Sequence, residues 1–220
     1  NQYMRIPVAT YRFQFHKGFT FNNARELLQY LHELGISAVY ASPIFLAGPD
    51  STHGYDICGF DQINPNLGSM DDFNAFTAEI RKRGMGLLVD MVPNHMGSHA
   101  TNSWWIDVLK NGPNSKFATY FDINWHPANP SLQGKVLLPV LGDHYSAVLE
   151  HGQLKLVFES GEYHLAYFDK RFPVSPESEA AFLKNEQTHV LAELNGNPRS
   201  FDKLHQFIEL QHYRLAFWRV

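Results

Sequence analysis

The 220-residue sequence contains one cysteine, Cys58, which excludes an internal disulfide and a multi-thiolate metal site. A lone thiol is typical of a reducing compartment, so we expect a cytoplasmic protein. The sequence also lacks the run of about 18 apolar residues that a membrane helix needs, and residues 1–10 do not have the basic-then-apolar layout of a signal peptide. We therefore expect no membrane partner.

Positive charge is scarce as well. Eighteen Lys and Arg against 22 Asp and Glu give a formal charge of -4, which predicts no nucleic-acid partner. The glycine-rich motifs that hold nucleotide phosphates and the Gly-x-Ser-x-Gly nucleophile elbow are absent, so nothing indicates a nucleotide cofactor or a serine nucleophile of that type. The 44% hydrophobic and 14% aromatic residues are enough for a sizeable globular core.

The first part of the chain alternates extended segments with helical ones, a pattern typical of parallel strands joined by crossover helices. Asn22 is a candidate cap for the first helix, and Gly84 is a stop signal for the second, which begins at Met70 or Asp71. The third extended segment is nearly all apolar, which predicts burial on both faces. The strands are predicted over residues 8–15, 38–45 and 85–92, with a first helix over residues 22–33.

After Pro93 this alternation stops. The following residues form Trp-, Pro- and Asn-rich loops, with a hairpin predicted over residues 153–159 and 162–168 about a Ser-Gly turn. The polar stretch 195–198 ends this region, and residues 201–218 have the apolar spacing of one helix. We predict three divisions: βα units over residues 1–96, an inserted subdomain over residues 97–200, and a helix returning to the barrel over residues 201–220.

The fold class predicted from these elements is α/β. A closed (β/α)8 barrel takes roughly 250 residues without large insertions, and much of this chain is spent on the insertion. The prediction is therefore the amino-terminal part of a (β/α)8 barrel with a subdomain inserted after the third strand, cut from a longer chain. A small open sheet is the alternative.

Catalytic groups on parallel sheets gather at the carboxyl ends of the strands. Asp90 lies inside an otherwise apolar predicted strand, where an unpaired carboxylate costs several kcal/mol, so it needs dedicated partners. It either anchors a loop by pairing with an arginine such as Arg12 or serves a functional site. His95, beside Asn94, is either a structural histidine or a ligand-facing one.

Aromatic residues beside imidazoles or glycines suit a sugar, which needs a flat face for its C–H groups and donors for its hydroxyls. Tyr55 with His53 has this composition, although a packed loop tyrosine is equally consistent. Trp104 and Trp105 allow the same two interpretations, with one of them expected in the core, and His144 favours a structural role.

A zinc site is a weaker interpretation. His95 and His99 are four residues apart, but Gly97 and Ser98 lie between them and no Glu follows His95. We predict no metal and no cofactor. A small metal hydrolase using His95, His99 and Asp90 remains an alternative that bound zinc would support.

The string from Asp90 to His95 resembles the first signature region of the α-amylase family of glycoside hydrolases. Further segments resemble its glucan-rearranging members: residues 10–15, 51–56, 64–68, 104–109, 137–142 and 211–219. The resemblance implies a barrel enzyme that turns the reducing-end α-1,4 bond of a maltooligosaccharide, or other α-1,4-glucan, into an α-1,1 bond. It places the nucleophile and general acid beyond Val220, so these 220 residues are expected to be inactive alone.

The resemblance also assigns roles to the candidate residues. His53 and Tyr55 would line the subsite of the cleaved sugar, His95 would bind its hydroxyls, and Asp90 would hold the site electrostatically. Asn94 corresponds to a calcium ligand in many amylases, but the other ligands are not recognisable here. The residues expected to cover the pocket are Trp104, Trp105 and His144. An α-glucan hydrolase of the same family and a non-catalytic sugar-binding module are the competing functions.

Overall fold

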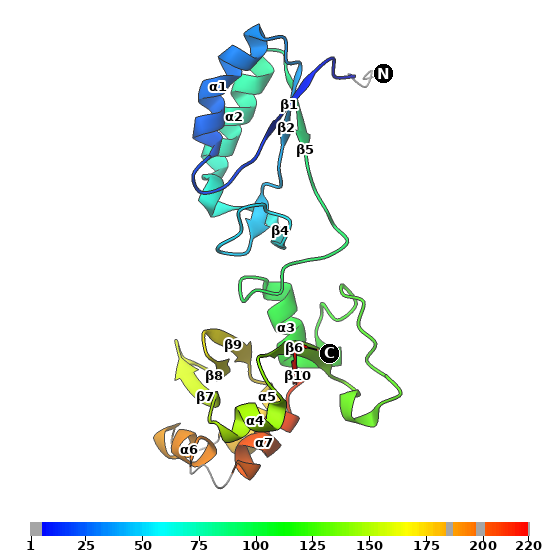
Figure 1. Cartoon of the computed structure of the whole chain (residues 1–220), viewed down its shortest axis with the longest axis vertical. Coiled ribbons are helices and arrows are strands. Elements are labelled where there is room, and N and C mark those ends of the chain that lie inside the picture. Colours follow the sequence, from blue (N-terminus) through cyan, green and yellow to red (C-terminus); the bar gives the residue numbers. More distant parts are fainter. Residues whose placement is uncertain (1–5, 184–186, 197–200, 220) are drawn as a thin grey trace. The chain divides into compact units, whose positions relative to one another are not determined.

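The structure is a computed structural model that describes residues 6–183, 187–196 and 201–219. It divides into two compact units, Asn1–Asn102 and Ser103–Val220 (Figure 1). Each unit has its own hydrophobic core, and each is described separately.

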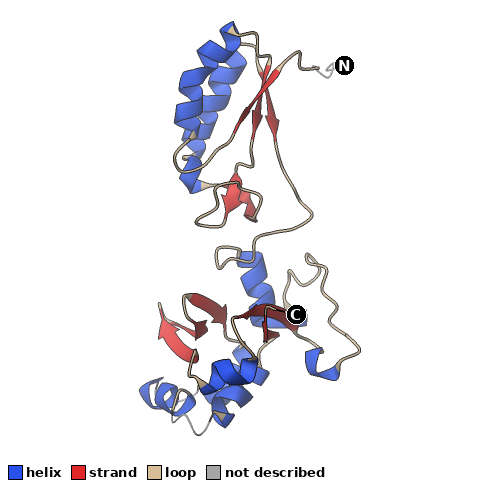
Figure 2. Cartoon of the chain, viewed as in Figure 1, coloured by secondary structure: helices blue, strands red, loops and turns tan. Residues whose placement is uncertain are grey.

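The first unit contains the predicted parallel sheet (Figure 2). Strands β1 (Thr10–Phe13), β2 (Ala38–Ala41) and β5 (Gly86–Val89) pair in parallel in the order β1-β2-β5, which confirms the predicted arrangement. The strands are shorter than the predicted ranges. The backbone leaves the sheet after Phe13, because the next buried N–H, that of Phe15, donates to Ser42 Oγ at 2.8 Å.

Helices α1 (Phe21–Glu33) and α2 (Met70–Lys82) pack against each other beside this sheet (Figure 1). The predicted start of α2 is confirmed, with Ser69 Oγ accepting from the Asp72 N–H at 3.1 Å. The cap predicted for α1 is wrong. Thr20 takes that position, and its N–H donates to Asn23 Oδ1 at 3.0 Å, while Asn22 donates to Asp72 Oδ1 at 2.8 Å and links the two helices.

Large aromatic side chains fill the core of this unit. Phe13, Phe15, Phe21 and Phe76 are each at most 3% exposed, and their rings contact one another. The prediction that the third strand is buried on both faces is wrong for the described residues. Helices α1 and α2 pack together beside this sheet and do not cover both of its faces, so Leu88 of β5 remains 44% exposed.

The long loop predicted after the second strand contains an antiparallel pair, β3 (Phe45–Ala47) and β4 (Ile57–Ile63), followed by a 3-10 turn over Pro65–Leu67. Phe45, which the sequence analysis put in the second strand, belongs to β3. Three residues were too few for a period-2 pattern to appear. The residues between β3 and β4 form the loop that carries His53 and Tyr55.

The second unit combines short helices with two small sheets. The predicted hairpin is confirmed as β7 and β8, and both turn residues have positive φ, 54° at Ser160 and 87° at Gly161, as a tight two-residue hairpin requires. A third antiparallel strand, β9, was not predicted. The elements are α3 (Ser103–Asn111), β6 (Val136–Leu141), α4 (Tyr145–Glu150), β7 (Leu154–Glu159), β8 (Glu162–Tyr167), β9 (Lys170–Pro173), α5 (Pro176–Phe182), α6 (Gln187–Leu194), α7 (Asp202–Glu209) and β10 (Tyr213–Phe217), with 3-10 turns over Gly112–Asn114 and Pro130–Leu132.

The single helix predicted over residues 201–218 is wrong beyond Glu209. Helix α7 ends there, and β10 pairs in parallel with β6. Tyr213 and Leu215 are buried in the core of the second unit, so pairing and burial replace local helical spacing. Residues 197–198 of the polar stretch lie outside the described residues. The inserted subdomain and the return to the barrel remain predictions.

Across the described ranges, no helix has both the length and the apolar character needed to cross a bilayer.

Candidate functional site

The carboxyl ends of the three parallel strands share one carboxylate. Asp90, directly after β5, uses a single oxygen, Oδ2, to accept from the Arg12 guanidinium of β1 at 3.1 Å and from the Tyr40 hydroxyl of β2 at 3.0 Å. The Tyr55 hydroxyl donates to the same oxygen at 2.5 Å. The predicted need of Asp90 for dedicated partners is met, and Arg12 is one of them.

Arg12 is held on several sides. Its second terminal nitrogen donates to the Tyr55 hydroxyl oxygen at 3.0 Å, and its guanidinium lies 4.7 Å from the centre of the Tyr40 ring. Strand register explains this arrangement, because Arg12 and Tyr40 are direct neighbours in the β1–β2 pairing. Tyr40 was not among the predicted site residues, although it is the one residue with a polar end in the otherwise apolar strand β2.

These contacts change the acidity of two groups. Hydrogen bonds from Tyr55, and then from Arg12 and Tyr40, hold the pKa of Asp90 below its ordinary value despite partial burial. The same Asp90 contact raises the pKa of Tyr55, so its hydroxyl remains a proton donor at neutral pH. The centre of the cluster is therefore an ionised carboxylate that accepts from one cation and two phenols.

The lowered pKa of Asp90 gives a testable pH dependence. A carboxylate with a depressed pKa stabilises the fold above the ordinary Asp value of about 3.9 and loses this contribution as the pH falls through its folded-state pKa. We expect the difference in free energy of unfolding between the wild type and Asp90→Asn, measured by urea unfolding, to be constant near neutral pH and to disappear in strong acid. A difference that persists unchanged in strong acid would contradict this account.

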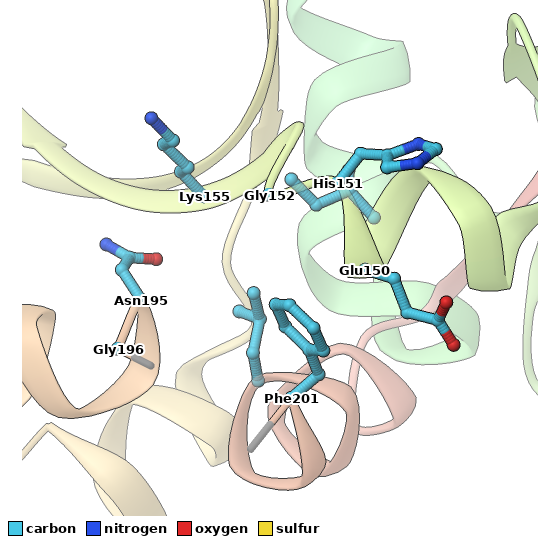
Figure 3. A pocket seen from close by; sticks show the side chains of 9 residues that line it. Glu150, His151, Gly152, Lys155, Asn195, Gly196 and Phe201 are labelled. Atoms are coloured by element: carbon cyan, nitrogen blue, oxygen red, sulfur yellow. The ribbon is translucent and has the colours of Figure 1, made fainter. Parts of the chain in front are cut away.

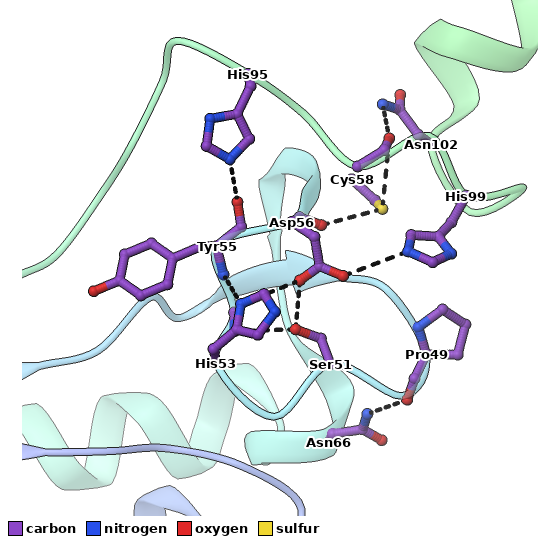
Figure 4. Close-up of polar contacts among 12 residues, drawn as sticks. Pro49, Ser51, His53, Tyr55, Asp56, Cys58, Asn66, His95, His99 and Asn102 are labelled. Atoms are coloured by element: carbon purple, nitrogen blue, oxygen red, sulfur yellow. Dashed lines mark hydrogen bonds and ion pairs between the residues drawn. The ribbon is translucent and has the colours of Figure 1, made fainter. Parts of the chain in front are cut away.

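Tyr55 connects the carboxylate cluster to two histidines. Its N–H donates to His53 Nδ1 at 3.0 Å, and the two rings stack with centroids 6.0 Å apart and an interplanar angle of 19°. Its carbonyl oxygen lies 3.0 Å from His95 Nε2 (Figure 4). Tyr55 is therefore fixed at its hydroxyl, its N–H and its carbonyl.

His95 uses both ring nitrogens within the protein. Nε2 faces the Tyr55 carbonyl, and Nδ1 lies 3.1 Å from Asn94 Oδ1. Both of these oxygens only accept, so a neutral His95 ring donates its single N–H to one of the two. His95 itself is exposed, so its edge is open to solvent while its orientation is set by Tyr55 and Asn94.

The structure thus brings five of the predicted residues together in the first unit: His53, Tyr55, Asp90, Asn94 and His95. The other three lie in the second unit. Trp105 packs against the core there, Trp104 stacks on Phe117 at 5.7 Å, and the His144 ring lies 5.2 Å from that of Phe217. Their expected role over the pocket remains a prediction.

A separate hollow of about 270 Å³ lies in the second unit, between the end of α4 and the end of α6 (Figure 3). Its polar lining includes Lys155 and Asn195, and none of the predicted site residues lines it. It therefore adds nothing to the candidate site.

The metal interpretation finds no support in the side-chain contacts. His95 faces the Tyr55 carbonyl, His99 faces Asp56, and Asp90 faces Arg12, so the three proposed ligands have different partners. Within the described part of the chain, no group of three or more His, Cys, Asp or Glu side chains is placed to hold a metal ion. The Asn94 amide is directed at His95.

Comparison with known proteins decides the family. The model of the α-amylase catalytic domain matches residues 21–176, which is more than half of the chain. The chain belongs to the α-amylase family. The predicted fold class was part of a barrel enzyme of this family. The family match and the solved structures confirm this prediction.

The curated relatives of this chain include enzymes named as trehalose synthases. A putative maltooligosyl trehalose synthase of Mycobacterium tuberculosis is 45% identical over 147 residues, covering 63% of this chain and 19% of the relative. An intracellular maltogenic amylase of Bacillus subtilis is 37% identical over 100 residues, covering 46% of this chain and 16% of the relative. The chain therefore spans about a fifth of the length of these curated relatives.

Solved structures agree with this relationship. A maltooligosyl trehalose synthase structure matches 98% of this chain and 26% of its own chain, with a TM-score of 0.80 and 31% identity. The Arthrobacter ramosus maltooligosyltrehalose synthase matches 97% of this chain and 24% of its own, with a TM-score of 0.75 and 32% identity. The resemblance to these synthases covers nearly the whole chain.

Proposed function

We propose that the full-length protein carrying this chain converts the reducing-end α-1,4 bond of a maltooligosaccharide, or of another α-1,4-glucan, into an α-1,1 bond. The observation that carries the proposal is Tyr55, an aromatic residue at the strand ends whose hydroxyl, N–H and carbonyl are all hydrogen-bonded, between His53 and His95. The choice of a rearranging enzyme over other α-glucan enzymes rests on two solved synthase structures, which match 96% and 98% of the chain.

In this proposal the described residues bind and orient one sugar. The Tyr55 ring stacks on the sugar face, with His53 beside it. Because His53 Nδ1 accepts from the Tyr55 N–H, neutral His53 carries its proton on Nε2 and can donate it to a hydroxyl. His95 and Asn94 supply further polar contacts, and a sugar hydroxyl near His95 shares the ring N–H with either the Tyr55 carbonyl or Asn94 Oδ1.

The reaction is a retaining transglycosylation. A carboxylate attacks the anomeric carbon, and a carboxylic acid about 5 to 5.5 Å away protonates the leaving oxygen. The same acid, now a carboxylate, removes the proton of the acceptor hydroxyl when the α-1,1 bond forms. We place both groups on barrel strands outside these 220 residues. Asp90 and Arg12 support the sugar site and take no part in the bond exchange.

Water must be kept from the covalent intermediate, since its attack releases free glucose in place of the rearranged product. We propose that the second unit serves this purpose through Trp104, Trp105 and His144. The proposal follows the partly buried indoles of Trp104 and Trp105, the exposed His144, and the prediction that these residues belong to an insertion.

The experiment is incubation of the full-length protein with maltopentaose, followed by chromatography and a reducing-end assay. Rearrangement removes the reducing end without releasing glucose, whereas hydrolysis creates a new reducing end for each bond broken. We expect loss of reducing ends and a product with a terminal trehalosyl unit. Glucose with maltotetraose would identify an α-glucan hydrolase, and binding without turnover would identify a sugar-binding module.

A further inference from the structure

A second polar cluster lies directly beside the Tyr55 site, centred on Asp56 (Figure 4). One carboxylate oxygen accepts from Ser51 Oγ, and that hydroxyl oxygen accepts from the Gly54 N–H at 3.0 Å. The other oxygen lies 3.4 Å from His99 Nε2. Asp56 therefore connects residues within the loop between β3 and β4, and it also links this loop to the segment that follows β5.

This contact is one of three that join the same two segments. His95 contacts the Tyr55 carbonyl at 3.0 Å, and the Gly97 N–H donates to the Ile57 carbonyl at 2.8 Å. With His99 on Asp56, every second residue from 95 to 99 contacts the stretch from 55 to 57. The loop that carries His95 is thus held along the strand that follows Tyr55.

Two glycines allow a close approach of the backbone at the cluster. A Cβ at Gly48 would lie 2.4 Å from Asp56 Oδ2 and 2.6 Å from His99 Nε2, so a side chain there would displace one of these two groups. A Cβ at Gly97 would lie 2.6 Å from the Asp56 carbonyl oxygen. The Gly48 backbone therefore lies against the Asp56 and His99 side chains, and the Gly97 backbone lies against the Asp56 backbone.

Stability alone does not account for such a pair. The His99 side chain is 50% exposed and that of Asp56 is 24% exposed, and polar side-chain contacts open to solvent contribute little to the free energy of unfolding. We propose that Asp56 and His99 are positioning residues that set the place of Tyr55 and His95 relative to the bound sugar. This inference rests on the proposed function of the same site.

The test uses the full-length protein with maltopentaose and compares His99→Ala, His99→Gln and Asp56→Asn. Misplacing a sugar-contacting group by a fraction of an ångström affects the transition state more than ground-state binding, so we expect kcat to fall about tenfold in His99→Ala with KM changed by less than about threefold. Asp56→Asn should resemble it. His99→Gln keeps a side-chain N–H directed at Asp56 and should restore most of the turnover.

Glu79→Gln is the matched control. It disrupts the Glu79–Arg83 ion pair on α2, where the side chains are 32% and 18% exposed, and it should leave kcat within about twofold. Thermal unfolding of every variant should stay close to the wild type. Unchanged kcat in His99→Ala, equal loss in His99→Gln, or a loss that parallels a lowered Tm would overturn the positioning role.

The outcomes separate this inference from the proposed function. If the wild type hydrolyses maltopentaose instead of rearranging it, the proposed function fails, while the ratios between the variants and the wild type still decide the role of Asp56 and His99. A wild type that binds glucan without turnover overturns both.

Discussion

Asp90→Ala in the full-length protein is expected to lower kcat/KM for maltopentaose by roughly two to three orders of magnitude. One oxygen of Asp90 accepts from Arg12, Tyr40 and Tyr55, so the substitution removes the shared acceptor of all three donors. Removing one preorganised polar group from a catalytic site costs about 10²- to 10³-fold in turnover. Because Arg12 is about a third exposed, with a side-chain value of 34%, we expect the lower part of that range.

Tyr55→Phe provides a graded comparison for this prediction. It keeps the aromatic ring and removes a single donor, so we expect a smaller loss, about tenfold in kcat/KM, close to the value of one hydrogen bond to a charged group. The measurement is the steady-state kcat/KM of both variants, and thermal unfolding checks that both variants fold. An Asp90→Ala enzyme within about threefold of the wild type would remove Asp90 from the sugar site.

His95→Ala is the second large effect. We expect its turnover number to fall by an amount equivalent to about 2 to 4 kcal/mol, as for other preorganised donors that act on the transition state. The structure gives two reasons for the loss: the variant lacks the ring edge that is open to solvent, and it leaves the Tyr55 carbonyl without the Nε2 contact.

The control for this prediction is His32→Ala, an exposed histidine in the last turn of α1. It should leave the turnover number unchanged. Single-turnover experiments with maltopentaose then separate the chemical step from product release for His95→Ala. A turnover number equal to that of the wild type would exclude His95 from transition-state stabilisation.

Much of the first unit could be predicted because its signals are local. Ser69, the acidic residues after it and the basic residues near Arg83 define α2 within a few residues of sequence. The hairpin about Ser160 was predictable for the same reason, since a two-residue turn with positive φ needs only its own residues.

The errors have a common cause, which is competition between local spacing and tertiary pairing. Residues 213–217 continue the apolar spacing of α7, but they form β10 because β6 offers a parallel partner and the second core buries Tyr213 and Leu215. Phe45 joined the second predicted strand, over residues 38–45, because it continues the apolar run of that strand, whereas it belongs to β3. Neither pairing partner is visible in the local sequence.

The sequence by itself determined which polar residues end the parallel strands and that one of them, Asp90, required partners. Only the tertiary structure decided that Arg12, Tyr40 and Tyr55 meet on the same oxygen, because strand register and the β3–β4 loop bring together residues up to 78 positions apart. It also decided that Asp56 and His99 lie together, since the Gly48 backbone packs against both side chains and the Gly97 backbone packs against the Asp56 carbonyl.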